Sequence, residues 1–184
     1  QTPAAPTVLL PKDKPVLVVI AEPKIDEAEF NCLRTNLYHE AGNQSRHGME
    51  AVALVTITRT RTKHYPSTVC GVVKAFTYTK RGHKVCQFSW YCDHKDHTPK
   101  LVRLIKFKGH TRRVPNLEEI AAWRTATLVA RNAMEGKIKD FLGHATNYHA
   151  TYVHPGWAKD KRYKVLAQVG SHIFYHDIAL KLKA

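Results

Sequence analysis

The stretch Leu37-Tyr38-His39-Glu40-Ala41-Gly42 decides how the chain is interpreted, because it places a carboxylate on the apolar side of a predicted helix. At about 100° per residue, a helix from about Asp26 gathers apolar side chains on one face, and Glu40 projects into that face beside Leu33. A carboxyl group held against an apolar wall tends to keep its proton, because desolvation disfavours the charged form. Glu40 is therefore a candidate proton donor near neutral pH. The alternative is a solvated Glu at a fraying helix end, or one that pairs with a nearby Arg.

The length of 184 residues and the hydrophobic content of 43% predict a single domain, because a chain of this size buries one core. A membrane span is not expected, since charged residues interrupt the apolar run 7–20. The net charge of +14 favours an anionic partner, which charge alone leaves open as nucleic acid, an anionic membrane surface or an acidic cell-wall polymer. A surface that only confers solubility is the remaining alternative.

Proline and glycine positions predict the ends of the elements. Five prolines make residues 1–24 an extended N-terminal arm with an edge strand around 15–20. The first helix should run from about Asp26 to Ala41 and end in a left-handed cap at Gly42-Asn43. A second helix, from Gly48 to about Thr60, is apolar over most of its circumference and should be buried on nearly all sides.

Further along the chain, Ser67 should cap a short helix through Val73, and the basic run before it forms either a solvated loop or one side of an anion-binding cleft. Residues 75–100 lack periodicity, and the aromatic part from Cys86 to Cys92 suits a loop that lines a cleft. Residues 101–108 fit a strand or a short basic helix equally well.

The clearest later helix begins at Pro115-Asn116, has Glu119 placed as in a capping box, and stops before Gly136. Its core-facing residues should be Leu117, Ile120, Trp123 and Leu128. Aromatic and Thr-rich segments divided by Pro155-Gly156 then predict short strands. The fold class is thus α+β, mostly helical with a small late β-sheet.

The cysteines and histidines give weak signals. Four cysteines are too few for a disulfide scaffold, so we expect them to pack as small apolar groups, with a Cys86–Cys92 bridge as an alternative outside a cytoplasm. Zinc ligation by Cys86, Cys92, His94 and His97 has poor spacing, and no H-E-x-x-H motif is present. No phosphate-binding glycine loop or G-x-S-x-G elbow occurs either. We therefore expect no metal and no cofactor.

Cleavage of a glycosidic bond needs an acid of raised pKa that protonates the leaving oxygen, and Glu40 is the candidate for this acid. No second carboxylate is convincing, because Asp93, Asp96, Asp140 and Asp160 all fall in predicted loops. The sequence therefore favours a mechanism in which one Glu first protonates the leaving oxygen and then acts as base.

Several segments, in order, resemble the cell-wall hydrolase family that includes the spore-cortex-lytic enzyme SleB. The resemblance covers roughly residues 26–175 and rests on these pieces: 38–42, 48–55, Arg59, 65–66, 69–73, Gln87-Phe88-Ser89, Ala145-Thr146-Asn147-Tyr148-His149, 155–158 and 170–175. Two positions depart from the family's pattern: Gly42 stands where Arg is usual, and Thr58 precedes Arg59 where Asn is common.

The resemblance implies a lysozyme-like fold, a catalytic domain over 25–178 and a basic tail over 179–184. It implies cleavage of the glycan strands of peptidoglycan between N-acetylmuramic acid and N-acetylglucosamine, commonly as a lytic transglycosylase, with true hydrolysis by a muramidase as the alternative. The family's catalytic Glu falls on Glu40. Gln87, Phe88 and Ser89 would line the cleft, Tyr148 would support the sugar or the carboxyl group of Glu40, and His149 would also bind substrate, while His172 and Tyr175 would buttress the sheet.

The resemblance implies that the partner is peptidoglycan. It also implies that the protein is a monomer and that it acts on the bacterial cell wall, in the periplasm or outside the cell. A module of this size suits a phage endolysin or virion enzyme as well as a bacterial one. The alternative, which is not an enzymatic function, is nucleic-acid binding through the basic clusters Arg59–Lys63 and Arg103–Arg113. The ordered motifs, rather than the charge, favour the wall enzyme and no nucleic acid.

Overall fold

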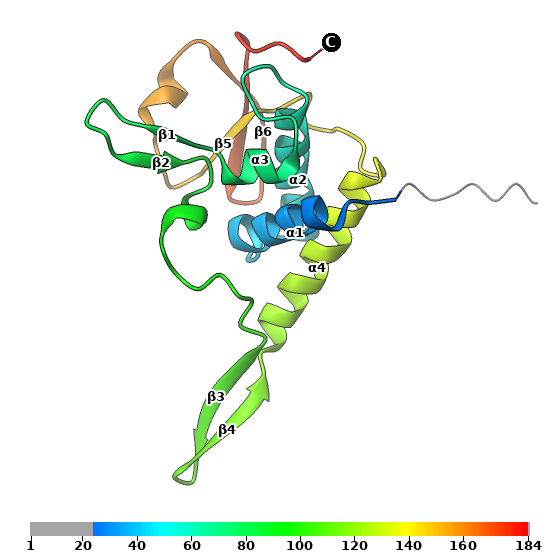
Figure 1. The fold of residues 1–184 in the computed structure, drawn as a ribbon, viewed down its shortest axis with the longest axis vertical. Helices are drawn as coiled ribbons and strands as arrows, with labels where there is room; N and C mark the ends of the chain where they lie inside the picture. The colour runs from blue at the N-terminus through cyan, green and yellow to red at the C-terminus, as the bar shows by residue number, and fades with distance from the viewer. Residues whose placement is uncertain (1–23, 184) are drawn as a thin grey trace, which may run out of the picture.

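A computed structural model describes residues 24–183, and Figure 1 shows a helical body with a small sheet on one side and a long hairpin that projects from the other end. The helices are α1 (Glu27–Ala41), α2 (Arg46–Thr60), α3 (Val69–Lys74) and α4 (Leu117–Met134). The strand expected around 15–20 lies outside the described residues.

Helix α1 forms as the sequence predicts. The carboxylate of Asp26 caps its first turn by accepting hydrogen bonds from the backbone N–H groups of Ala28 and Glu29, at 2.9 and 3.0 Å. Its apolar face is buried in the core, through Phe30, Leu33, Leu37 and Ala41.

The helix ends differently from the prediction, because Gly42 is right-handed (φ −60°, ψ −27°) rather than left-handed. A Cβ atom at Gly42 would lie 2.3 Å from the carbonyl oxygen of Tyr38. Lack of space, not a positive φ, therefore accounts for glycine at this position.

Helix α2 is the central helix of the body, and most of its length is buried as predicted. It begins two residues earlier than expected, at Arg46, because the hydroxyl of Ser45 caps it by accepting from the N–H of Gly48. Helix α3 is capped by Thr68 rather than by Ser67, since the Thr68 hydroxyl accepts from the N–H of Gly71 at 3.0 Å. The predicted helices are thus present, with ends that shift by one or two residues.

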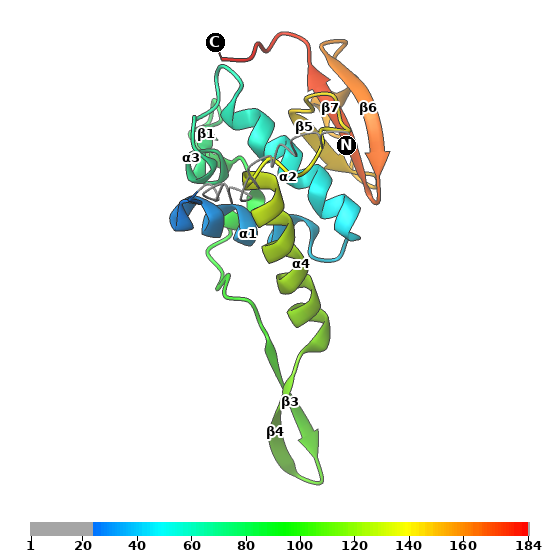
Figure 2. The same ribbon diagram turned by 90° about the vertical axis from the view of Figure 1, so that its right-hand side faces the viewer.

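Helix α4 packs on α1 and α2 through small residues, and the predicted core face is wrong at two of its four positions. Leu117 is 74% exposed and Leu128 is 46% exposed. Ala126, Val129, Ala130 and Ala133 form the buried stripe instead. Small side chains let the helices approach closely, whereas the first turn of α4 extends beyond the body (Figure 2).

The expected capping box of α4 is also absent. The side chain of Asn116 makes no capping hydrogen bond. The carboxylate of Glu119 instead accepts a hydrogen bond from the hydroxyl of Tyr38 on α1. Together with burial, this contact raises the pKa of Tyr38 to about 12.

The predicted small late sheet is present, with three antiparallel strands: β5 (Asn147–Ala150), β6 (Tyr163–Val169) and β7 (His172–Asp177). Their order is β5-β7-β6, and Tyr148 lies opposite Phe174 in the register. A short 3₁₀ helix, Gly156–Lys159, lies in the connection between β5 and β6. The sheet therefore holds Tyr148 against the core residue Phe174.

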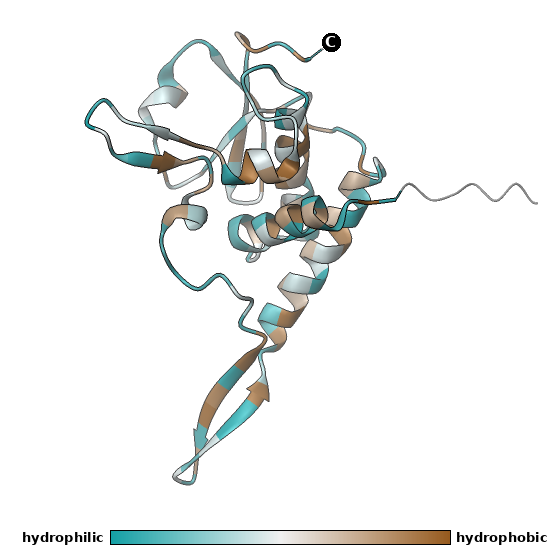
Figure 3. Ribbon diagram, viewed as in Figure 1, coloured by the Kyte–Doolittle hydropathy of each residue, from teal (hydrophilic) through white to brown (hydrophobic). Residues whose placement is uncertain are grey.

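Two separate hairpins complete the described part of the chain. The first, β1 (Phe76–Tyr78) with β2 (Lys84–Cys86), interrupts the segment that the sequence left as a loop, and a 3₁₀ helix, Ser89–Cys92, follows it. The second joins β3 (Val102–Phe107) to β4 (His110–Pro115), so the ambiguous segment 101–108 is a strand. Figure 3 shows hydrophobic and hydrophilic residues mixed along this second hairpin.

All four cysteines are paired, so the expectation that they pack as small apolar groups is wrong. Cys32 and Cys70 form a disulfide between α1 and α3, which lie side by side and bring the two Cα atoms to 5.2 Å. Cys86 and Cys92 form the second disulfide, the bridge that the sequence left open. Among residues 24–183, no helix is long and apolar enough to cross a membrane.

Candidate active site

Glu40 lies in the last turn of α1, where two pockets meet. The smaller pocket has a volume of about 290 Å³ and is lined by Glu40, Arg59, Cys86, Gln87, Phe88, Ser89, Asn147, Tyr148 and Trp157. The larger pocket, of about 680 Å³, is lined by Glu40 together with residues of α1, of the α1–α2 turn, of α4 and of the late sheet. A chain-like ligand could thus occupy both sides of this one carboxyl group.

The Glu40 carboxyl group is held by Tyr148, whose hydroxyl donates a 2.8 Å hydrogen bond to Oε2. Burial raises the pKa of Glu40, while the bond from Tyr148 and the positive charge of Arg59 act against this rise. Burial, and then the charge of Glu40, hold the pKa of Tyr148 well above its ordinary value, so Tyr148 remains a neutral donor. Glu40 is therefore placed to hold a proton and to release it.

Arg59 is a buried cation of this site, although the sequence indicated it only as part of a basic run and of the family resemblance, and not as a site residue. It is 3% exposed, its Nε donates to the carbonyl oxygen of Thr146 at 2.7 Å, and its guanidinium lies over the rings of Tyr65 and Phe88. With the amide of Gln87 turned to satisfy both groups, Oε1 accepts from both Nη atoms, at 3.1 and 3.2 Å. Arg59 thus ties α2 to the sheet and to the segment that carries Gln87.

The structure brings four of the five predicted substrate-binding residues to Glu40. Gln87, Phe88, Ser89 and Tyr148 line the smaller pocket with it. His149, the next residue on β5, does not line this pocket: its Nε2 lies 2.8 Å from the hydroxyl of Tyr175, and its ring stacks on that residue. Alternation along a strand sends neighbouring side chains to opposite faces, which accounts for the separation.

The larger pocket contains a second buried group that the sequence assigned only to buttressing the sheet. His172 is 8% exposed, its ring lies against Tyr148, and its Nδ1 has no hydrogen-bond partner among the described residues. Burial, and then the neighbouring His149, lower its pKa, which keeps the imidazole neutral. A neutral imidazole with a vacant nitrogen in a pocket can bind a hydroxyl or amide group of a ligand.

Two further acids line the larger pocket, both from the first turn of α4. Glu118 is exposed, and Glu119 accepts the hydrogen bond from Tyr38. Neither one stands out as a site residue in the sequence, because acids in the first turn of a helix ordinarily complement the helix dipole. Neither has the buried setting of Glu40.

The zinc interpretation does not fit the structure. Cys86 and Cys92 are joined in a disulfide and so offer no thiolate. No group of three or more His, Cys, Asp or Glu side chains in residues 24–183 is arranged to hold a metal ion.

Comparison with known proteins defines the family. The model of the Cell Wall Hydrolase family matches residues 43–175. The chain belongs to this cell wall hydrolase family. The match begins three residues after Glu40, so it includes the residues of both pockets from Asn43 to His172 but not the acid itself.

Two solved structures resemble this cell wall hydrolase. One is the catalytic domain of the germination-specific lytic transglycosylase SleB from Bacillus anthracis, with 19% identity, 84% of this chain and 98% of that chain covered, and a TM-score of 0.57. The other is the catalytic domain of the Bacillus cereus SleB protein, with 21% identity, 84% and 94% covered, and a TM-score of 0.54. No curated protein matches the chain. The expected lysozyme-like α+β fold of the SleB type is confirmed.

Proposed function

We propose that this cell wall hydrolase degrades peptidoglycan by cleaving the bond between N-acetylmuramic acid and N-acetylglucosamine, with Glu40 as general acid and base. The observation that carries the proposal is the position of Glu40. Its carboxyl group is partly buried, is bonded to Tyr148, and lies where two pockets meet on a fold of the SleB type. A glycan strand that fills both pockets would pass its glycosidic oxygen over this acid.

In the first step, protonated Glu40 donates its proton to the glycosidic oxygen as the bond to the anomeric carbon breaks. Burial favours the protonated form and so prepares the acid. As the proton leaves, the carboxylate that forms is stabilised by the hydroxyl of Tyr148 and by the charge of Arg59. These two groups thus act on the form of Glu40 that exists after proton transfer.

In the second step, the Glu40 carboxylate removes a proton from the nucleophile that attacks the anomeric carbon. In a lytic transglycosylase, the nucleophile is the 6-hydroxyl of the muramic acid itself, which leaves a 1,6-anhydro end and returns the proton to Glu40. In a muramidase, the nucleophile is water, and the product is a reducing end. We favour the first route because it needs a single carboxylate, and because one solved relative is described as a lytic transglycosylase.

The remaining roles follow from the lining of the pockets. We assign Gln87, Phe88, Ser89 and Tyr148 to binding of the sugar in the smaller pocket. His149 acts from the opposite face of β5, where its bond to Tyr175 fixes the strand that carries Tyr148. The two disulfides suit an oxidising compartment such as the periplasm or the cell exterior, where the wall lies.

The test replaces Glu40→Gln and measures clearing of purified peptidoglycan sacculi. We expect a loss of about 10²–10⁴-fold or more, because that is the contribution of a positioned acid. The matched control is Glu27→Gln, since Glu27 is an exposed residue in the first turn of the same helix. Activity of Glu40→Gln close to that of the wild type would refute the role of Glu40.

Mass spectrometry of the released muropeptides separates the two routes. A 1,6-anhydro product is lighter by one water than a product with a reducing end, so the masses identify the nucleophile directly. Reducing ends alone would assign the muramidase route. In that case Glu118→Gln and Glu119→Gln would show whether an acid of the larger pocket positions the water.

A further inference from the structure

The hairpin β3–β4 stands apart from the body of the molecule and is almost fully exposed. It projects from the body (Figures 1 and 2), and all six residues of β3 are exposed, as are five of the six residues of β4. A two-stranded hairpin alone is at best marginally stable in water and needs packing on a further surface. The hairpin therefore presents a face that a partner can cover.

The hairpin carries apolar side chains in water. Leu104 is 68% exposed, Phe107 is 63% exposed, Val102 is 46% exposed and Ile105 is 37% exposed. Single exposed apolar residues are common, but four on one short strand are not; because side chains alternate along a strand, Val102 and Leu104 lie on one face of the hairpin and Ile105 and Phe107 on the other.

The same hairpin is strongly basic. Residues 98–117 contain no Asp or Glu and carry six cations: Lys100, Arg103, Lys106, Lys108, Arg112 and Arg113. Within residues 24–183, none of these six forms an ion pair. This charge repels a second copy of the hairpin and attracts an anionic partner.

In the pairing of β3 with β4, apolar side chains lie opposite basic ones. Leu104 lies opposite Arg113, Ile105 lies opposite Arg112, and Phe107 lies opposite His110 at the turn. Residues directly opposite one another point to the same face of a hairpin. Each face therefore presents an apolar side chain with a basic one beside it.

We propose that the β3–β4 hairpin docks on an anionic lipid membrane surface. There, with its turn inserted, the hairpin would place side chains from both faces, Leu104 on one and Ile105 and Phe107 on the other, at the boundary between headgroups and acyl chains, while Arg112 and Arg113 would contact lipid phosphates. A polyanion such as DNA or a wall polymer would use the charges but would give the aliphatic side chains nothing to bury against. The lipid surface is the partner that uses both.

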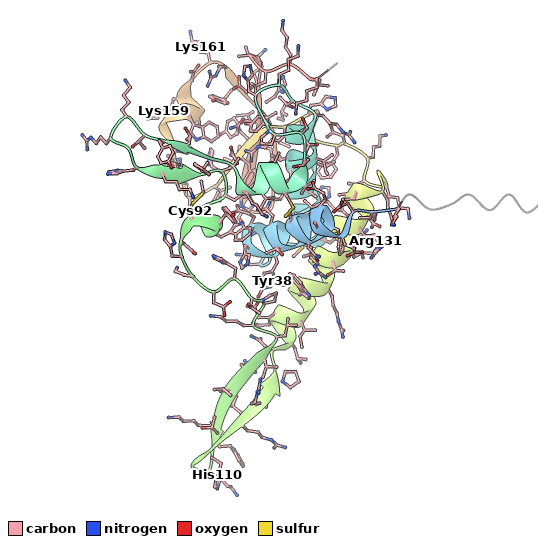
Figure 4. The ribbon with its side chains drawn as sticks, viewed as in Figure 1. Tyr38, Cys92, His110, Arg131, Lys159 and Lys161 are labelled. Carbon is pink, nitrogen blue, oxygen red and sulfur yellow. A yellow bond between two sulfur atoms is a disulfide. The ribbon has the colours of Figure 1, made fainter. Side chains whose placement is uncertain are left out.

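Docking would also set the position of the active site. The hairpin runs directly into α4, whose first turn supplies Glu118 and Glu119 to the larger pocket. Figure 4 places His110 at the far end of the hairpin, with Tyr38 near its base and Lys159 and Lys161 at the opposite end of the molecule. A docked hairpin would hold the cleft at a fixed height above the membrane.

The experiment measures binding of the whole chain to vesicles by flotation. Vesicles of phosphatidylglycerol with phosphatidylethanolamine provide the anionic surface, and phosphatidylcholine vesicles provide the neutral one. We expect binding to the anionic vesicles to be at least about tenfold tighter and to weaken with added salt, because charged contacts at a surface are screened.

Two double variants separate the two kinds of contact. Leu104→Ser with Phe107→Ser removes apolar contact, and Arg112→Gln with Arg113→Gln removes charge; each should weaken binding to anionic vesicles by at least about tenfold. The matched controls are Val165→Ser with Leu166→Ser, exposed on β6, and Lys159→Gln with Lys161→Gln. Both controls should bind as the wild type does.

Three results would overturn the proposal. The first is no binding of the wild type to anionic vesicles. The second is vesicle binding that is weakened in the Arg112–Arg113 double variant but unchanged in the Leu104–Phe107 double variant. Binding through charge alone would assign the hairpin to a polyanion such as DNA or murein. The third is a change from dimer to monomer in the Leu–Phe variant, measured by sedimentation, which would assign the face to a second copy of the chain.

Discussion

The hydroxyl of Tyr148 lies 2.8 Å from Oε2 of Glu40, and this hydrogen bond spans 108 residues of sequence. It connects the last turn of α1 to the first strand of the late sheet, so the acid is fixed by tertiary structure rather than by its own helix. Because the bond favours the ionised carboxylate, it opposes the rise in pKa that burial causes. The readiness of Glu40 to give up its proton therefore depends on Tyr148.

The first prediction is that Tyr148→Phe raises the pKa of Glu40 further. The variant removes a group that stabilises the charged form, while the burial that disfavours this form remains. Since Glu40 must be protonated to act as an acid, the alkaline limb of the activity profile should move to higher pH. The maximal rate should fall about tenfold, because a bond to a charged group is lost.

The measurement is clearing of sacculi as a function of pH, with Tyr91→Phe as the control. Tyr91 follows Trp90 in the 3₁₀ helix, and its hydroxyl makes no hydrogen bond among the described residues. An alkaline limb that stays in place in Tyr148→Phe would show that the phenol does not set the pKa of Glu40.

The second prediction concerns folding stability. The folded-state pKa of Glu40 lies above the unfolded value, so its stabilising contribution is fully present below the unfolded pKa and is lost as pH rises through the folded pKa. Glu40→Gln cannot ionise and escapes this loss. The variant should therefore unfold at a higher temperature than the wild type near pH 8 and at a similar temperature near pH 4.

Thermal unfolding across this pH range measures the effect, and the exposed Glu27→Gln again serves as the control. A Glu40→Gln protein that is less stable than the wild type at the alkaline end would contradict the sign of the argument. The result is independent of the activity assay, because it needs no substrate.

Sequence periodicity predicted the helices well, because their apolar faces repeat at the helical period. It failed on α4, where Leu117 and Leu128 are exposed and alanines form the contact. A periodic pattern ranks large apolar residues as core, whereas α4 meets α1 and α2 through its small ones. The close approach of the helices, which makes this possible, is not visible in a single sequence.

The candidate site was predictable in part. Glu40 stood out because an acid on an apolar face is unusual, and the ordered motifs indicated Gln87, Phe88, Ser89 and Tyr148. Arg59 was part of the family resemblance, but its place in the site was not predicted, because an Arg in a basic run ordinarily faces solvent. Its burial depends on the Thr146 carbonyl and on two aromatic rings that arrive from distant segments.

The third prediction is that Arg59→Lys destabilises the fold. Lysine keeps the positive charge near Glu40 but lacks the planar fork that contacts Thr146 and Gln87 and lies over the rings of Tyr65 and Phe88. Leaving the Thr146 carbonyl without its donor should lower the free energy of unfolding by about 1–3 kcal/mol. Urea unfolding measures this loss.

The control for Arg59→Lys is Arg61→Lys, two residues along the same chain at an exposed position. It should change the free energy of unfolding by less than about 0.5 kcal/mol, as exposed substitutions usually do. Equal free energies for the two variants would mean that Arg59 contributes only charge.

The fourth prediction is that the two disulfides have separable roles. Cys32–Cys70 closes a separation of 38 residues between α1 and α3, and Cys86–Cys92 closes one of 6 residues beside Gln87. The entropy of loop closure predicts that replacing the first pair with alanine lowers the free energy of unfolding by about 4 kcal/mol, and the second pair by about 2 kcal/mol. Because Cys86 lines the smaller pocket, replacing the Cys86–Cys92 pair should reduce the clearing of sacculi more than replacing the Cys32–Cys70 pair does, at temperatures where both variants are folded. Denaturant unfolding and clearing assays on the two double variants test this, and the reverse ranking in either measurement would contradict it.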